Sequence, residues 1–379
     1  MKKPFKIWYE KDKTHAEFLQ EITELNKYDP DIEKVKTGKN FPDNPDTLQK
    51  IIYLDMPDVI VTYGFPERTV LGVEFSAEAP SGHDIFQRLA RVSAAAEFST
   101  PFAFLFPEKK FIIREKSERW DLYNPLSLKA LVNIARFHRI PILSFFWRAS
   151  QLTGERSNGY LICDEKYKNL PDREDEEIKE FVDFVNLIIS YTIENKKFVE
   201  AIFDPFYIER ETKMWASFHN RMQEKKDLFQ WSPLTSCEVV STQDMLNNLK
   251  KEINIEIKLP THVINRKETL IYKPDVTTFR ADPYAGSLIG IDYLTCRNGP
   301  SVRHRYRNLA MHFKNVDFHE MKKMYSRYYE RCPFNPNYKE IDRYLTLHLK
   351  DGCRYTKQKE LRIYCYISDL LIFSDAVLY

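Results

Sequence analysis

Residues 56–76 form the stretch that decides the predicted fold, and they read MPDVIVTYGFPERTVLGVEFS. Residues 57–63 and 69–75 are rich in β-branched and aromatic side chains, which are typical of strands. The residues between them, GFPER, have the length and the glycine of a hairpin loop. We therefore expect an antiparallel hairpin in which Asp58 opens the first strand and Glu74 lies near the end of the second. Carboxylates placed in this way converge at one edge of a small sheet.

A helix and a further strand are predicted after this hairpin. Residues 81–84 (SGHD) are typical of a helix N-terminus. The apolar residues that follow recur at helical spacing: Ile85, Leu89, Val92 and Ala96. Residues 100–106 are nearly all apolar, as expected of a strand that is covered on both faces. The order predicts an α/β fold around a mixed sheet, with Gln87 and Arg91 opposite the apolar stripe of the helix and Arg88 at its border.

The composition is that of a folded protein with a sizeable core. The chain has 379 residues, of which 43% are hydrophobic and 14% aromatic, so two or three domains are expected. It contains no apolar run of about 18 residues and no apolar segment behind its basic start, so we expect neither a membrane span nor a secretory signal. The six cysteines include no C-x-x-C pair, which indicates reduced thiols in the cytoplasm and not zinc ligands.

Charge and motifs limit the ligands that are expected. The formal net charge is only +2, so any nucleic-acid binding must come from local basic patches. The sequence contains neither the glycine-rich dinucleotide motif nor the P-loop, so we expect no nucleotide cofactor. It also lacks the G-x-S-x-G and H-E-x-x-H motifs of many serine hydrolases and zinc proteases.

The middle of the chain suggests a division into three parts. Residues 164–177 are charged and contain proline, which is typical of a linker. Apolar residues at helical spacing then follow in 178–203. We therefore predict a first domain at 1–165, a helical connector at 166–230 and a second domain at 231–379.

A degenerate repeat links the two predicted domains. The sequence Pro-Asp-Val at 57–59 recurs at 274–276, 217 residues later. Gly-Val-Glu-Phe at 72–75 corresponds to Gly-Ile-Asp-Tyr at 290–293 with an offset of 218. The apolar helix stripe corresponds to Val302, Tyr306, Leu309 and Phe313. This order of acid, hairpin, acid and helix predicts that the core is duplicated.

The two carboxylates of the first hairpin suit a divalent metal ion. Mg²⁺ prefers hard oxygen ligands and keeps several positions for water and substrate phosphate. Such an ion polarises a phosphoryl oxygen and lowers the pKa of a bound water, while Arg88 and Gln87 would neutralise or orient the phosphate. A second interpretation of Asp58 is ordinary turn chemistry after a proline. Glu74 lies in a buried type of strand and would need a metal or a cationic partner if it faces inward.

These residues resemble the PD-(D/E)xK nuclease superfamily, which includes many type II restriction endonucleases. Its motif has Pro-Asp at one strand, Glu/Asp-x-Lys on the next, and a following helix that often carries Gln or Arg. Here these places are taken by Pro57-Asp58, Glu74-Phe75-Ser76 and Gln87-Arg88. The resemblance covers residues 50–106, and in weaker form 270–313. It implies a restriction-endonuclease-like core in which Asp58 and Glu74 hold Mg²⁺, or Mn²⁺ in its place, for the cleavage of double-stranded DNA.

One residue departs from the motif. Ser76 stands where the superfamily usually has the lysine that orients the attacking water. In some members this role moves to the following helix, which nominates Arg88 and, more weakly, Gln87. The predicted catalytic set is therefore Asp58, Glu74, Ser76, Gln87 and Arg88.

The second copy is expected to be inactive. Asp275 and Asp292 take the places of the two acids, but Leu294 stands at the lysine position. A basic, tyrosine-rich stretch at 297–331 suits phosphate contact and base stacking, although a solvated basic surface over core tyrosines would have the same composition. The predicted DNA contacts are Arg91, Arg303, Arg305, Arg307, Lys314, Lys322 and Lys323.

The sequence as a whole predicts a Mg²⁺-dependent DNA endonuclease of restriction type. The alternative is a catalytically inactive nucleic-acid-binding or assembly protein that retains the fold but has lost the lysine. A third hypothesis is an RNA-processing nuclease. Action as a homodimer is compatible with each of them.

Overall fold

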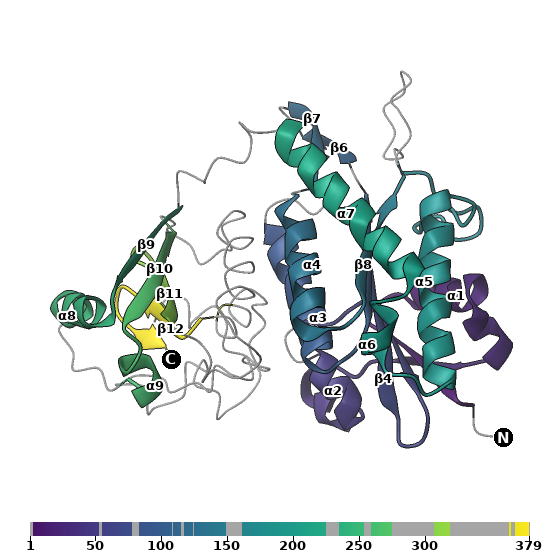
Figure 1. Ribbon diagram of the computed structural model, residues 1–379, viewed down its shortest axis with the longest axis horizontal. Helices are drawn as coiled ribbons and strands as arrows, with labels where there is room; N and C mark the ends of the chain where they lie inside the picture. Colours follow the sequence, from purple (N-terminus) through teal and green to yellow (C-terminus); the bar gives the residue numbers. More distant parts are fainter. Residues whose placement is uncertain are drawn as a thin grey trace. The chain divides into compact units, whose positions relative to one another are not determined.

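The chain forms two compact units, each built around a mixed sheet (Figure 1). The first unit comprises residues 1–81 and 91–225, and the second comprises 82–90 and 226–379. The computed structural model describes residues 3–52, 55–77, 83–107, 109–114, 117–123, 125–148, 161–224, 235–253, 259–274, 307–318, 364 and 368–378. The predicted α/β class is confirmed.

The first unit has a six-stranded sheet in the order β2-β1-β3-β4-β5-β8. Its strands are β1 (Phe5–Tyr9), β2 (Asp31–Lys34), β3 (Val59–Tyr63), β4 (Arg68–Phe75), β5 (Phe102–Pro107) and β8 (Ile142–Trp147). β3 is antiparallel to both of its neighbours, β1 and β4, whereas β4, β5 and β8 run parallel. A separate hairpin is formed by β6 (Lys109–Arg114) and β7 (Ser117–Leu122).

The predicted hairpin and the strand after it are confirmed. β3 and β4 pair antiparallel around the predicted loop, with Val59 opposite Val73. Every residue of β4 after Arg68 is buried, and so is all of β5. The two strands approach closely at Gly72, where an added Cβ would lie 2.7 Å from the ring of Phe102. Glycine is therefore needed at this position for the parallel pairing of β4 with β5.

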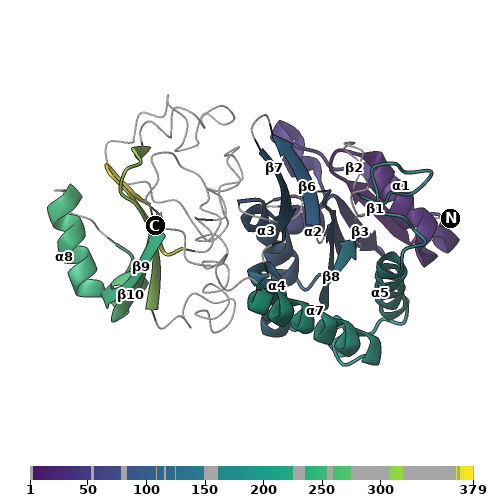
Figure 2. The ribbon, with the colours of Figure 1, turned by 90° about the horizontal axis from the view of Figure 1, so that it is seen from above.

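Helices cover both faces of this sheet (Figure 2). They are α1 (Lys13–Ile22), α2 (Asp46–Ile52), α3 (His83–Glu97), α4 (Leu126–His138), α5 (Glu176–Ile193), α6 (Phe198–Ala201) and α7 (Pro205–Glu224), with 3-10 helices at Glu24–Tyr28 and Gly38–Asp43. α4 lies on one side of the sheet and α1 and α5 lie on the other (Figures 1 and 2). The helix predicted after the hairpin is confirmed and is α3. Among the described residues, no helix is long and apolar enough to cross a membrane.

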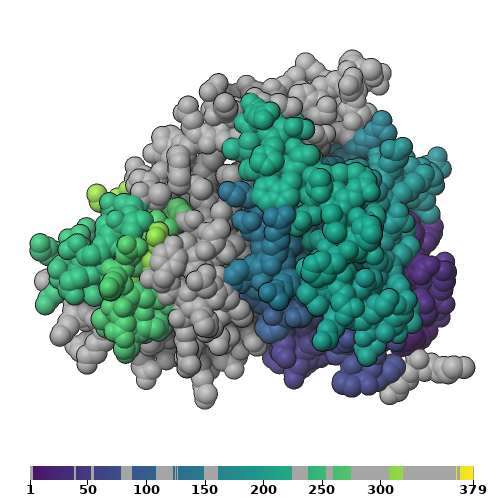
Figure 3. Space-filling model, viewed as in Figure 1, coloured from purple at the N-terminus to yellow at the C-terminus, as the bar shows by residue number. Residues whose placement is uncertain are grey.

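The predicted helical connector at 166–230 is wrong, because its helices belong to the first unit. α5 packs on β4 and β8, and Phe181 of α5 contacts the ring of Phe75. In the space-filling view the residues of α5 and α7, in teal and green, form a continuous surface of this unit (Figure 3). The charges that suggested a linker form ion pairs instead, since Arg173 lies 2.6 Å from Asp164 and 2.8 Å from Glu21.

The second unit has a five-stranded sheet in the order β13-β12-β11-β10-β9. Its elements are β9 (Thr235–Ser241), α8 (Thr242–Ile253), α9 (Thr261–Ile264), β10 (Glu268–Pro274), β11 (Arg307–Phe313), β12 (Leu370–Phe373) and β13 (Val377–Leu378). β9 is antiparallel to β10, and β10, β11 and β12 are parallel. The series β3, β4, β5 and β8 of the first unit has the same relative directions.

Nevertheless, the prediction that the helix after the first hairpin recurs 217 residues later is wrong. Residues 307–313, predicted to be helical, form β11, and Leu309 pairs with Leu270 of β10. Residues 308–311 are all buried, and a short apolar run of this kind fits a buried strand as well as a helix. The predicted second hairpin after β10, with Asp275 and Asp292, lies outside the described residues.

Candidate functional site

Asp58 and Glu74 lie at the same edge of the first sheet and face the same guanidinium group. Arg91 Nη1, on α3, donates a close hydrogen bond to Glu74 Oε2 and lies 4.0 Å from Asp58 Oδ1. Asp58 Oδ2 accepts a hydrogen bond of 2.8 Å from the backbone N–H of Phe75, directly after Glu74. The hairpin thus brings the two predicted carboxylates together, as its register requires.

Asp55 is a third carboxylate in this cluster, and the sequence pattern did not reveal it. Its Oδ2 accepts a hydrogen bond of 2.7 Å from Arg91 Nε. The side chains of Asp55 and Glu74 are each only 3% exposed, that of Arg91 is 9% exposed and that of Asp58 is 17% exposed. The only available signal was the position of Asp55 three residues before Asp58, which by itself carries no known motif.

The cluster holds more negative than positive charge among its described side chains. Three carboxylates, those of Asp55, Asp58 and Glu74, face the single guanidinium of Arg91. Burial, followed by the negative charge of Glu74, raises the pKa of Asp58 well above its usual range. Burial opposes the charge on Arg91, but Glu74 and Asp55 hold its pKa above the usual range, so the guanidinium stays protonated. Burial and the charge of Glu74 therefore favour the uncharged form of Asp58.

Arg91, predicted to contact DNA from the side of the helix opposite the apolar stripe, is buried. The helical spacing predicts one apolar stripe on α3, with Arg91 opposite to it. In the structure every residue from 90 to 96 is buried, so α3 is covered on more than one side. A charged residue on the second covered side needs partners, which are the carboxylates of Asp55 and Glu74.

Ser76, Arg88 and Gln87 complete the predicted catalytic set. Ser76 is 2% exposed, and its N–H donates to the carbonyl of Leu105 at 2.8 Å, which extends the pairing of β4 with β5. Its hydroxyl cannot supply the charge of the motif lysine. Arg88 is half-buried on α3. The side chain of Gln87 lies outside the described residues.

The predicted basic surface of the second unit is described only in part. Arg307 begins β11, is half-buried and pairs with Glu268 at 3.4 Å. Lys314 is exposed on the turn after β11. The predicted contacts outside the described residues are Arg303, Arg305, Lys322 and Lys323.

Asp58 and Glu74 are the two residues of this cluster that could hold the predicted Mg²⁺ or Mn²⁺. Within the described part of the chain, no three His, Cys, Asp or Glu side chains are grouped as a ready-made metal cage. Mg²⁺ does not require such a cage, because it is usually held by one or two carboxylates together with waters and substrate phosphates. The meeting of two carboxylates from neighbouring strands is the structural feature on which a cation site would rest.

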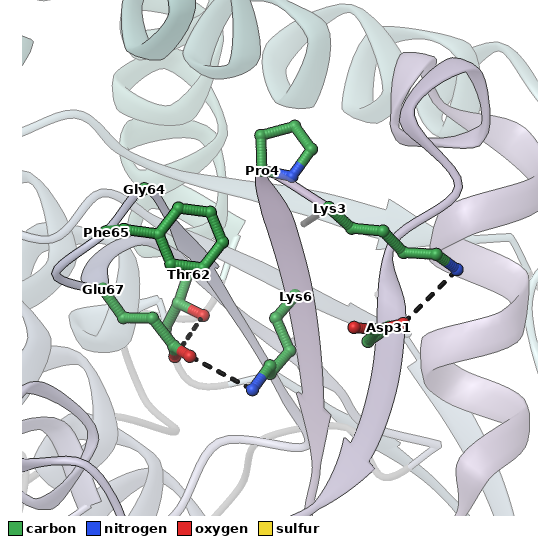
Figure 4. Close-up of a pocket in the computed structure, with 8 residues that line it drawn as sticks. All are labelled: Lys3, Pro4, Lys6, Asp31, Thr62, Gly64, Phe65 and Glu67. Atoms are coloured by element: carbon green, nitrogen blue, oxygen red, sulfur yellow. Dashed lines mark hydrogen bonds and ion pairs between the residues drawn. The ribbon is translucent and has the colours of Figure 1, made fainter. Parts of the chain in front are cut away.

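A cavity of about 360 Å³ lies at the other end of β3, beside the hairpin loop (Figure 4). Its lining is Lys3, Pro4, Lys6, Asp31, Thr62, Gly64, Phe65 and Glu67. Lys3 lies 3.3 Å from Asp31, and Lys6 lies 3.1 Å from Glu67, so both ammonium groups are already neutralised by neighbouring carboxylates. Because its lysines already have carboxylate neighbours, this cavity is a poor site for phosphate.

Comparison with known proteins does not assign the chain to a family. No family model, curated protein or solved structure matches it. The function is therefore argued from the chemistry of the acidic cluster.

Proposed function

We propose that the first unit is a Mg²⁺-dependent phosphodiester hydrolase that cleaves double-stranded DNA, with Asp58 and Glu74 as the carboxylates that hold the metal. The observation that carries the proposal is the convergence of these two acids, from adjacent antiparallel strands, on one buried guanidinium. The helix that supplies the guanidinium follows the hairpin directly, as in the PD-(D/E)xK motif. The same proposal includes cleavage of the restriction type and action as a homodimer.

The residues of the site have distinct roles. When bound, Mg²⁺ would polarise a phosphoryl oxygen and lower the pKa of a water. Asp58 is oriented by the N–H of Phe75, and its own carbonyl accepts from the N–H of Glu10 at 3.0 Å. Because a carboxylate must be ionised to bind a metal, a bound cation would compete with the proton, whose affinity for Asp58 is raised by burial and by Glu74. Arg91 fixes the position of Glu74.

The test is cleavage of supercoiled plasmid by the full chain in Mg²⁺, with EDTA as the metal control. We expect nicked or linear product from the native protein, and none from Asp58→Asn or Glu74→Gln. Glu33→Gln is the matched control, because this acid lies on β2 of the same sheet and pairs with Lys6 at 3.1 Å, away from the cluster. Cleavage at the native rate by the double variant D58N/E74Q would refute the proposal.

The second candidate is a nucleic-acid-binding protein without catalytic activity. Two observations favour it: Ser76 supplies no charge, and the guanidinium of Arg91 already contacts Glu74. This candidate predicts a gel shift of double-stranded DNA without cleavage in either Mg²⁺ or Mn²⁺. Competition between RNA and DNA substrates in the same assay tests the RNA-processing hypothesis.

A further inference from the structure

We propose that Arg91 is a built-in competitor of the divalent cation, and that Asp55 is the positioning residue that retains the guanidinium when the cation takes Glu74. The inference rests on the proposed metal site at Asp58 and Glu74. It adds Arg91 and Asp55, which lie outside the PD-(D/E)xK motif, to the residues that set the cation affinity of that site.

The first step of the argument is the way in which Arg91 divides its hydrogen bonds. Its Nε donates to Asp55 Oδ2 at 2.7 Å, while its Nη1 donates to Glu74 Oε2 and lies 4.0 Å from Asp58 Oδ1. The guanidinium is a rigid plane whose donors point in fixed and different directions. The bond from Nε to Asp55 can therefore persist when Nη1 gives up Glu74.

The second step concerns burial. The side chains of Asp55 and Arg91 are 3% and 9% exposed, so water is a poor substitute for a lost partner. A buried charge without a partner is strongly disfavoured. An arginine held only by Glu74 would therefore resist displacement by a cation, whereas an arginine that is also held by Asp55 keeps a partner after displacement.

The third step concerns charge. The positive charge of Arg91 lies within 4.0 Å of both proposed metal carboxylates and repels a second cation at that place. Neutralising Arg91 should therefore strengthen cation binding. Neutralising Asp55 should weaken it, because Glu74 then becomes the main partner of the guanidinium and the cluster loses one negative charge. The two substitutions, at hydrogen-bonded neighbours, are thus predicted to have opposite signs.

The experiment is isothermal titration of the full-length protein with Mn²⁺ alone, without nucleic acid. Arg91→Gln and Arg91→Met both remove the charge, and the glutamine amide can still donate hydrogen bonds, so Arg91→Gln serves if the methionine variant does not fold. We expect tighter Mn²⁺ binding, by about tenfold or more, in the folded Arg91 variant. For Asp55→Asn we expect binding weaker by roughly 10- to 100-fold, the range usual for partners of metal-holding residues.

The double variant shows whether Asp55 acts through Arg91. We expect Asp55→Asn to lose less affinity in the R91Q or R91M background than in the native one, since no guanidinium remains to be held. An equal loss in both backgrounds would overturn the positioning role of Asp55. Weaker or unchanged Mn²⁺ binding by the Arg91 variants would overturn the competitor role of Arg91.

The outcome for Asp58→Asn separates this inference from the proposed function. If native protein binds Mn²⁺ and Asp58→Asn abolishes the binding, the metal site stands, and the Arg91 and Asp55 variants test the inference alone. If neither the native protein nor the Arg91 variants bind Mn²⁺ at millimolar concentration, the proposed metal site itself is wrong, and this inference is refuted with it.

Discussion

Replacing Gly72 by alanine tests whether the close approach of β4 to β5 determines the stability of the first unit. The new Cβ would lie 2.7 Å and 2.9 Å from two ring atoms of Phe102, whereas ordinary contacts begin at 3.4 Å. The ring would have to move by about 0.7 Å, and it is fully buried. Overpacking of this kind costs about 1–3 kcal/mol, and the more restricted unfolded chain returns about 0.4–1 kcal/mol. We expect the free energy of unfolding to fall by about 1–2 kcal/mol.

The assay is urea unfolding of the full chain, followed by tryptophan fluorescence. Four of the five tryptophans belong to the first unit, among them the buried Trp8 and Trp147. Because the chain has two units, the transition reported by these residues is analysed separately from that of the second unit. Phe102→Leu makes room for the Cβ, so it should cost less in the Gly72→Ala background than in the native one. Equal costs in both backgrounds, or no loss of stability in Gly72→Ala, would refute the reasoning.

Two further predictions concern ion pairs of the first unit. Glu21 accepts hydrogen bonds from cationic neighbours, first among them Lys166, which lower its pKa from the usual 4.5 to about 2. The stabilisation of the folded state by these hydrogen bonds is therefore fully present above pH 4.5 and is lost as the pH falls towards 2. Glu21→Gln should flatten the fall of the melting temperature across this pH window. An unchanged slope would show that Glu21 is not the responsible group. Arg210 is buried between Glu177, at 2.9 Å, and the carbonyl of Ser144, at 3.0 Å. Arg210→Met should lower the free energy of unfolding by about 2–3 kcal/mol in urea titrations, and a loss below about 0.5 kcal/mol would contradict a structural role for these bonds.

The local sequence pattern was sufficient to predict the hairpin that carries Asp58 and Glu74. The alternation and β-branched content of residues 57–75, the capping sequence before α3 and the apolar run of β5 each depend on neighbours in the chain. Because the register of a hairpin follows from its loop and its buried face, the meeting of Asp58 with Glu74 could be predicted as well.

The local sequence pattern did not predict the type or the place of elements that are buried on more than one side. In β11 every residue from 308 to 311 is buried, so neither the period of a helix nor that of a strand stands out. The sequence predicts a connector for α5 and α7 because it does not state which sheet covers an apolar helix face. Their assignment to the first unit follows from contacts with strands more than thirty residues away.

Arg91 and Asp55 show the same limit at the candidate site. The sequence predicted two acids on neighbouring strands, which the structure confirms, and from them a metal site. Only the tertiary structure decided that a buried arginine from α3 lies between them and that Asp55 holds it. The physical reason is that an amphipathic pattern records one covered face, whereas the partner of a buried charge is set by whichever segments fold against the other faces.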